Sequence, residues 1–290
     1  MPFICVCLCL LISCRKQIKP EVVIVKTEVP IIEAKTAPIG KPDTTHKTTL
    51  EQINMAEFST KGWWEERFGD RDFKGMLKEL KTEKDPEKRE DLIFELGYSY
   101  DTSAVQPLVE ILQKDRWAPV RAQAAKSLGI LGLGSADTFK LGFVKRKFGE
   151  DRSKALLSLK VSKIMPALRN ALYDKDIYVV YNVASTLIGL SDTSHTTLKV
   201  LLDIFRKKNI KKWKMEFVPR PDIPAEDQPK LKELQESAKA SIPGGALEVL
   251  KRVGNQFVIN GLTDALKDKD SWVREKARET LEELKEAEVK

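Results

Sequence analysis

The chain of 290 residues has no cysteine after Cys14 and only two histidines, His46 and His195. No disulfide framework, cysteine-based metal site or catalytic thiol can therefore lie beyond residue 14. Two histidines exclude a histidine-rich metal site, and neither lies in a nucleophile-elbow sequence, so we expect both to be ordinary surface residues. The sequence indicates no catalytic residue, no metal site and no cofactor, and we expect a protein that is not an enzyme.

Glycine and proline are sparse, at 15 and 14 residues, which excludes a collagen-like chain and a wholly disordered one. Hydrophobic residues make up 42% of the chain and charged residues 32%, the balance of a globular protein tilted toward charge. A chain of this length can bury a sizeable core. The net charge of +7 is too small a surplus to identify an anionic partner by itself.

A hydrophobic run long enough to cross a membrane is also missing from the N-terminal segment. Residues 3–13, FICVCLCLLIS, are apolar but shorter than the roughly twenty residues that a spanning helix needs. Their length matches the apolar core of a secretory signal peptide. The alternative is a buried, cysteine-rich first helix or strand, in which cysteine serves as a small hydrophobe.

The sequence LISC at residues 11–14 resembles the bacterial lipobox. The resemblance implies a signal peptide over residues 1–13, cleavage before Cys14 and lipid attachment to its sulfur. An anchor of two or three acyl chains holds a protein stably at a membrane. Because Arg15 follows the cysteine, rather than the Asp that retains many lipoproteins at the inner membrane, we expect a cell-envelope protein at the outer membrane, facing the periplasm or the cell surface.

Residues 14–57 have the composition of a tether rather than of a folded domain. Prolines recur at short intervals among lysines, threonines and β-branched residues, at Pro20, Pro30, Pro38 and Pro42. Such a composition favours an extended or disordered chain. We therefore expect a lipid-anchored, disordered tether over residues 14–57 and a folded domain over residues 58–290.

The folded part contains an internal repeat of about 31 or 32 residues. A shift of 94 residues aligns ALYDKDIYVVYNVASTL (171–187) with ALKDKDSWVREKARETL (265–281), and a shift of 32 aligns Gly97 with Gly129. Each unit shows the apolar spacing of two amphipathic helices, and such a hairpin must stack on its neighbours to bury its apolar face. The pattern predicts an all-α solenoid of about five or six helical hairpins.

Individual residues predict where the helices of these hairpins begin and end. Pro119 is suited to the first turn of a second helix, where its missing N–H costs nothing. Asp176 and Asp270 stand at the N-cap positions of the corresponding helices in later units. Gly129 is expected to end the second helix of its own unit as a C-cap.

The units PLVEIL…PVRAQAAKSLG and LTDALKDKDSWVREKARETL resemble the HEAT-like repeats of phycocyanobilin lyases. The resemblance implies an α-solenoid in which the arginine after the valine pairs with an acidic residue of a neighbouring repeat. Arg121 and Arg274 match this arginine, and Arg89 is the candidate in the first unit. Val180 occupies the place in the third unit, so we expect the ladder of ion pairs to be interrupted there.

Two basic stretches, at about residues 139–160 and 206–230, do not fit the repeat and are interpreted as insertions. Residues 140–163 carry eight Lys or Arg against two acids, and residues 206–214 carry six against none. Prolines predict an irregular loop over residues 218–229. The insertions are either solvated loops or binding segments for an anionic ligand or partner. The candidate binding residues are Lys145, Arg146, Lys147, Arg206, Lys207, Lys208, Lys211, Lys212, Trp213 and Lys214.

These observations favour a membrane-anchored, non-catalytic scaffold that binds a protein partner through the concave face of the solenoid. The alternative is a nucleic-acid-binding protein similar to HEAT-like DNA-alkylation glycosylases, using the basic insertions. The export signal counts against nucleic acid, as does the location of the basic residues in insertions instead of along the second helices. An accessory lyase activity is a third possibility that no residue constellation supports, and no small-molecule substrate is evident.

Overall fold

The computed structural model describes residues 71–132, 138–209, 212–215 and 226–288. Apart from Arg71, these residues belong to the second of two compact units of the chain, Asp72–Lys290. The expected signal peptide, Cys14, the tether and the part of the expected solenoid before residue 71 lie outside the described residues. Within the described ranges, no helix is both long and apolar enough to span a membrane.

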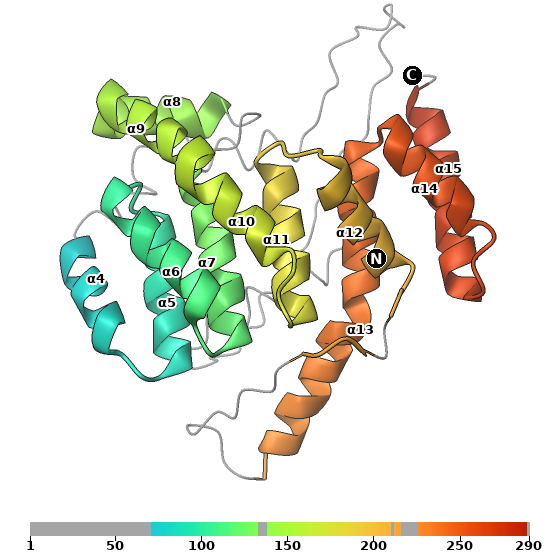
Figure 1. Cartoon of the computed structure of the whole chain (residues 1–290), viewed down its shortest axis with the longest axis horizontal. Coiled ribbons are helices and arrows are strands. Elements are labelled where there is room, and N and C mark those ends of the chain that lie inside the picture. Colours follow the sequence, from blue (N-terminus) through green and yellow to red (C-terminus); the bar gives the residue numbers. More distant parts are fainter. Residues whose placement is uncertain (1–70, 133–137, 210–211, 216–225, 289–290) are drawn as a thin grey trace, which may run out of the picture. The chain divides into compact units, whose positions relative to one another are not determined.

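Stacked helical hairpins form this second unit, as the repeat predicts (Figure 1). The described residues contain five pairs: α4 (Phe73–Thr82) with α5 (Pro86–Gly97), α6 (Val105–Lys114) with α7 (Ala118–Leu131), α10 (Met165–Ala171) with α11 (Ile177–Gly189), α12 (His195–Phe205) with α13 (Gln228–Val253), and α14 (Gln256–Ala265) with α15 (Ser271–Glu288). A 3₁₀ turn, η1 (Thr102–Ala104), leads into α6. The described part of the chain contains an isolated β-bridge but no sheet.

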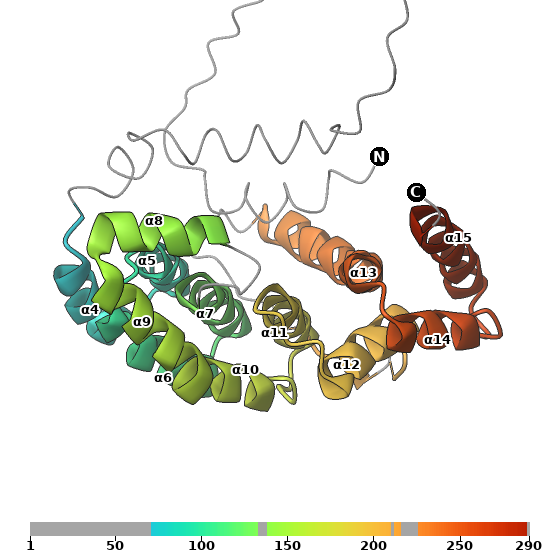
Figure 2. The same cartoon turned by 90° about the horizontal axis from the view of Figure 1, so that it is seen from above.

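The second helices of the hairpins form one layer and the first helices another. Figure 2 shows α5, α7, α11 and α13 side by side, with α6, α10, α12 and α14 along their other side. Helix α7 lies at the centre of the first three hairpins, against α5, α6 and α11. Its predicted inward face, Val120, Ala124 and Leu128, is fully buried. Burial of this kind is what stabilises the hairpins, which have no core of their own.

The structure confirms most of the predicted helix ends and corrects one. Pro119 lies in the first turn of α7, and the carboxylate of Asp176 accepts the Tyr178 N–H at 2.8 Å. The carboxylate of Asp270 likewise accepts the Trp272 N–H at 3.0 Å. The prediction for Gly129 is wrong, because α7 continues to Leu131. A Cβ at position 129 would lie 2.5 Å from Thr186 Cγ2, so glycine is present there because α7 and α11 approach closely.

The first insertion is helical rather than a loop. It forms α8 (Thr138–Phe148) and α9 (Glu150–Leu159), which continues through a π-helical turn, η2 (Lys160–Ile164), into α10. Gly149, with φ of +90°, makes the corner between α8 and α9, a conformation that a side chain would disfavour. The insertion thus adds one helix and lengthens the first helix of the third hairpin.

The second insertion contains turns and a short extended piece before α13 begins. Residues 206–209 are turns, 212–215 include the isolated bridge, and 216–225 lie outside the described residues. The predicted irregular loop over 218–229 is too long at its end, since α13 begins at Gln228. Pro229 favoured the loop prediction, but proline is also accepted in the first turn of a helix.

Candidate interaction surfaces

The turns inside three of the hairpins are built in the same way. Asp115, Asp174 and Asp268 occupy equivalent positions, and each carboxylate accepts the N–H of the residue two positions later. The bonds join Trp117 N to Asp115 Oδ1 (2.9 Å), Asp176 N to Asp174 Oδ1 (2.9 Å) and Asp270 N to Asp268 Oδ1 (3.1 Å). These bonds hold each turn in shape at the start of its second helix.

An arginine of the preceding part of the chain pairs with each of these aspartates. Arg89 binds Asp115, and Arg121 binds Asp174 with two hydrogen bonds of 2.8 Å. This confirms the ladder for Arg89 and Arg121. The expectation for Arg274, the equivalent arginine of the last hairpin, is wrong. It forms no ion pair with a described residue and donates to the carbonyl oxygens of Asp268 and Lys269 in its own turn.

The ladder is interrupted at the third hairpin, as predicted, because Val180 has no charge with which to pair with the fourth hairpin. The ladder resumes between the last two hairpins, where Arg206, directly after α12, binds the Asp268 carboxylate of the α14–α15 turn at 3.0 Å. Burial alone would raise the pKa of Asp268, but hydrogen bonds from the Asp270 N–H and from Arg206 hold it below its ordinary value. Arg206 follows a first helix and not the valine of a second helix, so a comparison of repeats at fixed spacing could not reveal this ion pair.

The second insertion is largely engaged within the solenoid. Arg206 and Lys207 bind Asp268 and Asp270 of the α14–α15 turn, and the Lys207 ammonium also lies 4.6 Å from the centre of the Trp272 ring. Lys208 pairs with Asp203 at 2.7 Å. Three candidate binding residues therefore have partners inside the chain, a role that sequence reasoning missed.

The short piece after these turns lies against the α10–α11 turn. The Lys214 carbonyl oxygen accepts the Ile177 N–H at 2.9 Å, next to the isolated bridge between Asp176 and Lys214. Trp213 is half-buried and donates its indole N–H to the Lys208 carbonyl oxygen at 3.1 Å. The side chains of Lys212 and Lys214 are exposed, and Lys211 lies outside the described residues.

The first insertion presents its cations to solvent. Lys145, Arg146 and Lys147 are exposed in the last turn of α8, and Lys145 forms an ion pair with Glu150 at 3.2 Å. Phe148 lies 6.0 Å from the ring of Tyr100, which pins the end of α8 to the solenoid. The two groups of candidate cations therefore lie in different places. The first group is on α8, and the second lies against the α10–α11 and α14–α15 turns.

A surface that sequence reasoning did not name lies on the layer of second helices. We call it the second-helix face. It consists of the half-buried residues Pro119, Gln123, Lys126 and Ile130 on α7, and Tyr178, Tyr181, Ser185 and Ile188 on α11. Their spacing of three and four residues places each set on one side of its helix. The same spacing is visible in the sequence, between the positions of the buried residues, and could have indicated this face.

The aromatic residues of the second-helix face are held in place by their neighbours. Lys126 donates to the Tyr178 hydroxyl at 3.3 Å, and its ammonium lies 5.4 Å from the centre of the same ring. Tyr181 packs on Gly245 of α13, where a Cβ would lie 2.5 Å from the tyrosine hydroxyl oxygen. The face therefore offers ordered aromatic and apolar groups that are only partly covered.

Comparison with protein families agrees with this architecture over residues 73–141. A family model described as HEAT repeats matches residues 73–141. Among solved structures, the chain is similar to the complex of CpcE and CpcF of phycocyanin lyase from Nostoc sp. PCC7120, with 13% identity over 86% of this chain and 100% of that chain and a TM-score of 0.29, a similarity too low to bear on function. No curated protein matches. The fold and the repeat define the chain as an all-α solenoid of HEAT-like helical hairpins.

Proposed function

We propose that the protein is a lipid-anchored scaffold of the cell envelope whose solenoid binds a protein partner on the second-helix face. The observation that carries the proposal is the set of ordered, half-buried side chains around Tyr178 and Tyr181. Protein interfaces are enriched in tyrosine and depleted of unpaired charge at their centres. The residues of α7 and α11 that face this surface have that composition, and the proposal assigns them no catalytic step.

The membrane attachment in this proposal depends on Cys14. It is supported by the lipobox-like residues 11–14 and by the proline-rich composition of residues 14–57. A tether of that length would let a folded domain reach partners away from the membrane surface.

The first prediction concerns Cys14. In a bacterial host, Cys14→Ala is expected to move most of the protein from the membrane fraction to the soluble fraction, because the sulfur that carries the lipid is gone. Fractionation followed by immunoblotting measures the shift. Cys9→Ala, a change of the same kind within the segment that would be removed, is the control and should leave the protein at the membrane. A mature chain that keeps residues 1–13 in mass spectrometry would contradict the anchor.

The second prediction tests the second-helix face. With the photocrosslinking amino acid p-benzoylphenylalanine at position 178, illumination of cells is expected to give a discrete crosslinked species. The same amino acid at the exposed Thr196 of α12 should give none, because α12 belongs to the layer of first helices. Lys126→Glu should weaken the crosslink at 178. Equal crosslinking at 178 and 196 would contradict the proposed face.

Binding of nucleic acid is not proposed. Arg206, Lys207 and Lys208 form ion pairs with Asp268, Asp270 and Asp203, which removes three cations from the surface that was expected to attract phosphates. Phosphate binding depends on the number of available cations, so the loss weakens this alternative.

A further inference from the structure

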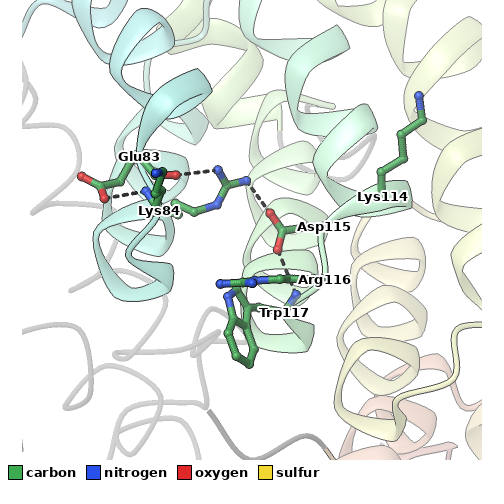
Figure 3. A pocket seen from close by; sticks show the side chains of 7 residues that line it. Glu83, Lys84, Lys114, Asp115, Arg116 and Trp117 are labelled. Carbon is green, nitrogen blue, oxygen red and sulfur yellow. Dashed lines mark hydrogen bonds and ion pairs between the residues drawn. The ribbon is translucent and has the colours of Figure 1, made fainter. Parts of the chain in front are cut away.

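A cavity of about 430 Å³ lies between the turn that joins α4 to α5 and the turn that joins α6 to α7 (Figure 3). Lys84 lines it on one side, and Lys114, Arg116 and Trp117 line it on the other. The volume falls in the range of sites that hold small ligands or single side chains. Its lining residues include none of the second-helix face and none of the two insertions.

The acidic groups at this cavity are already engaged. The Glu83 carboxylate accepts the N–H groups of Asp85 and Lys84, and the hydrogen bond from Asp85 is the main cause that lowers its pKa. Asp115 binds Arg89 and accepts the Trp117 N–H. The ammonium groups of Lys84 and Lys114 and the guanidinium of Arg116, in contrast, form no ion pair with any described residue. The cavity therefore has a surplus of positive charge.

Arg116 and Trp117 lie against each other in the cavity wall. The guanidinium of Arg116 lies 4.6 Å from the centre of the Trp117 ring, and Figure 3 shows the two side chains next to each other. The Arg116 carbonyl oxygen is held by Arg121. The Trp117 indole N–H is buried and has no hydrogen-bond partner in the part of the chain that the structure describes. A donor left in this state costs about 1–3 kcal/mol, which an incoming oxygen atom could recover.

The equivalent turns of later hairpins show what this turn lacks. Where the second hairpin has Trp117, the third and the last have Asp176 and Asp270, and the Asp270 carboxylate binds Lys207. The third turn also receives a piece of extended chain, since the Lys214 carbonyl oxygen accepts the Ile177 N–H. That piece is basic and the turn it meets is acidic. The α6–α7 turn is basic instead, with Lys114 and Arg116, so a segment that bound there in the same way would be acidic.

We propose that the cavity between residues 83–84 and 114–117 binds an acidic side chain carried by an extended segment of the protein partner. The carboxylate would interact with Lys84, Arg116 and the Trp117 indole N–H, and Lys114, which extends away from Asp115 in Figure 3, adds positive charge at the rim. Arginine in particular binds carboxylates in a planar, two-point geometry. This inference rests on the proposed function as a protein scaffold, because its ligand is a segment of the partner.

Fluorescein-labelled hexaglutamate serves as the probe, and anisotropy with the full chain measures its affinity. Arg116→Glu is expected to weaken binding about tenfold, since it replaces an attractive charge with a repulsive one at the cavity wall. Lys175→Glu is the matched control, because Lys175 is exposed and occupies the place of Arg116 in the next hairpin's turn. It should change the affinity by less than about twofold, as expected for an exposed charge outside the site.

An equal loss with both variants would mean general charge attraction and would overturn the proposal, as would unchanged binding with Arg116→Glu. Displacement of hexaglutamate by inorganic phosphate, but not by chloride of equal ionic strength, would overturn it in favour of a site for free phosphate. Circular dichroism checks that both variants fold. Tyr178→Ala should leave hexaglutamate binding unchanged, so a failure at the second-helix face and a failure at this cavity are distinguishable.

Discussion

Replacement of Arg121 by alanine is expected to lower the free energy of unfolding by about 3–5 kcal/mol, the usual effect of removing one partner of a buried ion pair. Arg121 is 3% exposed and makes two hydrogen bonds of 2.8 Å to Asp174. It also donates to the carbonyl oxygens of Asp115 and Arg116, so its loss frees acceptors in two turns. Urea denaturation of the full chain, monitored by circular dichroism, measures the change. The midpoint should shift while the m-value stays the same.

Arg274→Ala is the matched control for this prediction. Arg274 occupies the same position in the last hairpin and bonds the equivalent carbonyl oxygens of Asp268 and Lys269, at 2.7 and 3.0 Å. It has no carboxylate partner among the residues described by the structure, so the expected loss is only about 1 kcal/mol. Equal losses for the two variants would show that the carbonyl bonds, and not the pair between hairpins, stabilise the solenoid.

Gly97→Ala is expected to destabilise the protein by about 2 kcal/mol through overpacking between α5 and α7. A Cβ at this position would lie 2.8 Å from Ser127 Cβ and 3.0 Å from Ser127 Cα, so the backbone of one helix must move. Ser127 cannot turn away freely, because its hydroxyl donates to the Ile93 carbonyl oxygen at 2.8 Å. Thermal and urea unfolding report the change in stability.

Gly189→Ala provides the comparison for Gly97→Ala. Both glycines are the last residue of a second helix, of α5 and α11 respectively, and neither has a positive φ. A Cβ at position 189 would meet no atom within 4 Å. Alanine there should leave the stability unchanged or raise it by about 0.5 kcal/mol, since it restricts the unfolded chain. Destabilisation of similar size at both positions would contradict the packing argument.

The repeat itself explains why so much of the fold could be predicted. Each hairpin packs mainly on its neighbours, so the periodic apolar residues around Val120 and Leu128 and the N-cap at Asp176 carry most of the information. The local rules failed where a neighbouring helix mattered. Gly129 was predicted to end its helix because glycine often does so, but it lies inside α7, opposite Thr186.

The candidate sites were less predictable than the fold. A run of lysines and arginines at 206–214 looks like a binding segment, yet Arg206 and Lys207 meet Asp268 and Asp270 some sixty residues later. Nothing periodic connects those positions. The second-helix face and the cavity beside Trp117 also join residues from separate hairpins, and the sequence pattern of a single hairpin does not reveal them.

The amino-acid sequence alone determined the all-α solenoid and the helical hairpin as its unit. These properties follow from the period of apolar residues and from helix-end chemistry, which act over a few residues. Only the tertiary structure decided that Asp115 and Asp174 are the partners of Arg89 and Arg121, that Arg206 binds Asp268, that the first insertion is helical, and that the α6–α7 turn borders a cavity of positive charge. Those outcomes depend on which side chains, far apart in the sequence, are brought together when the hairpins stack. The charge composition of a segment does not tell which distant residues it will meet.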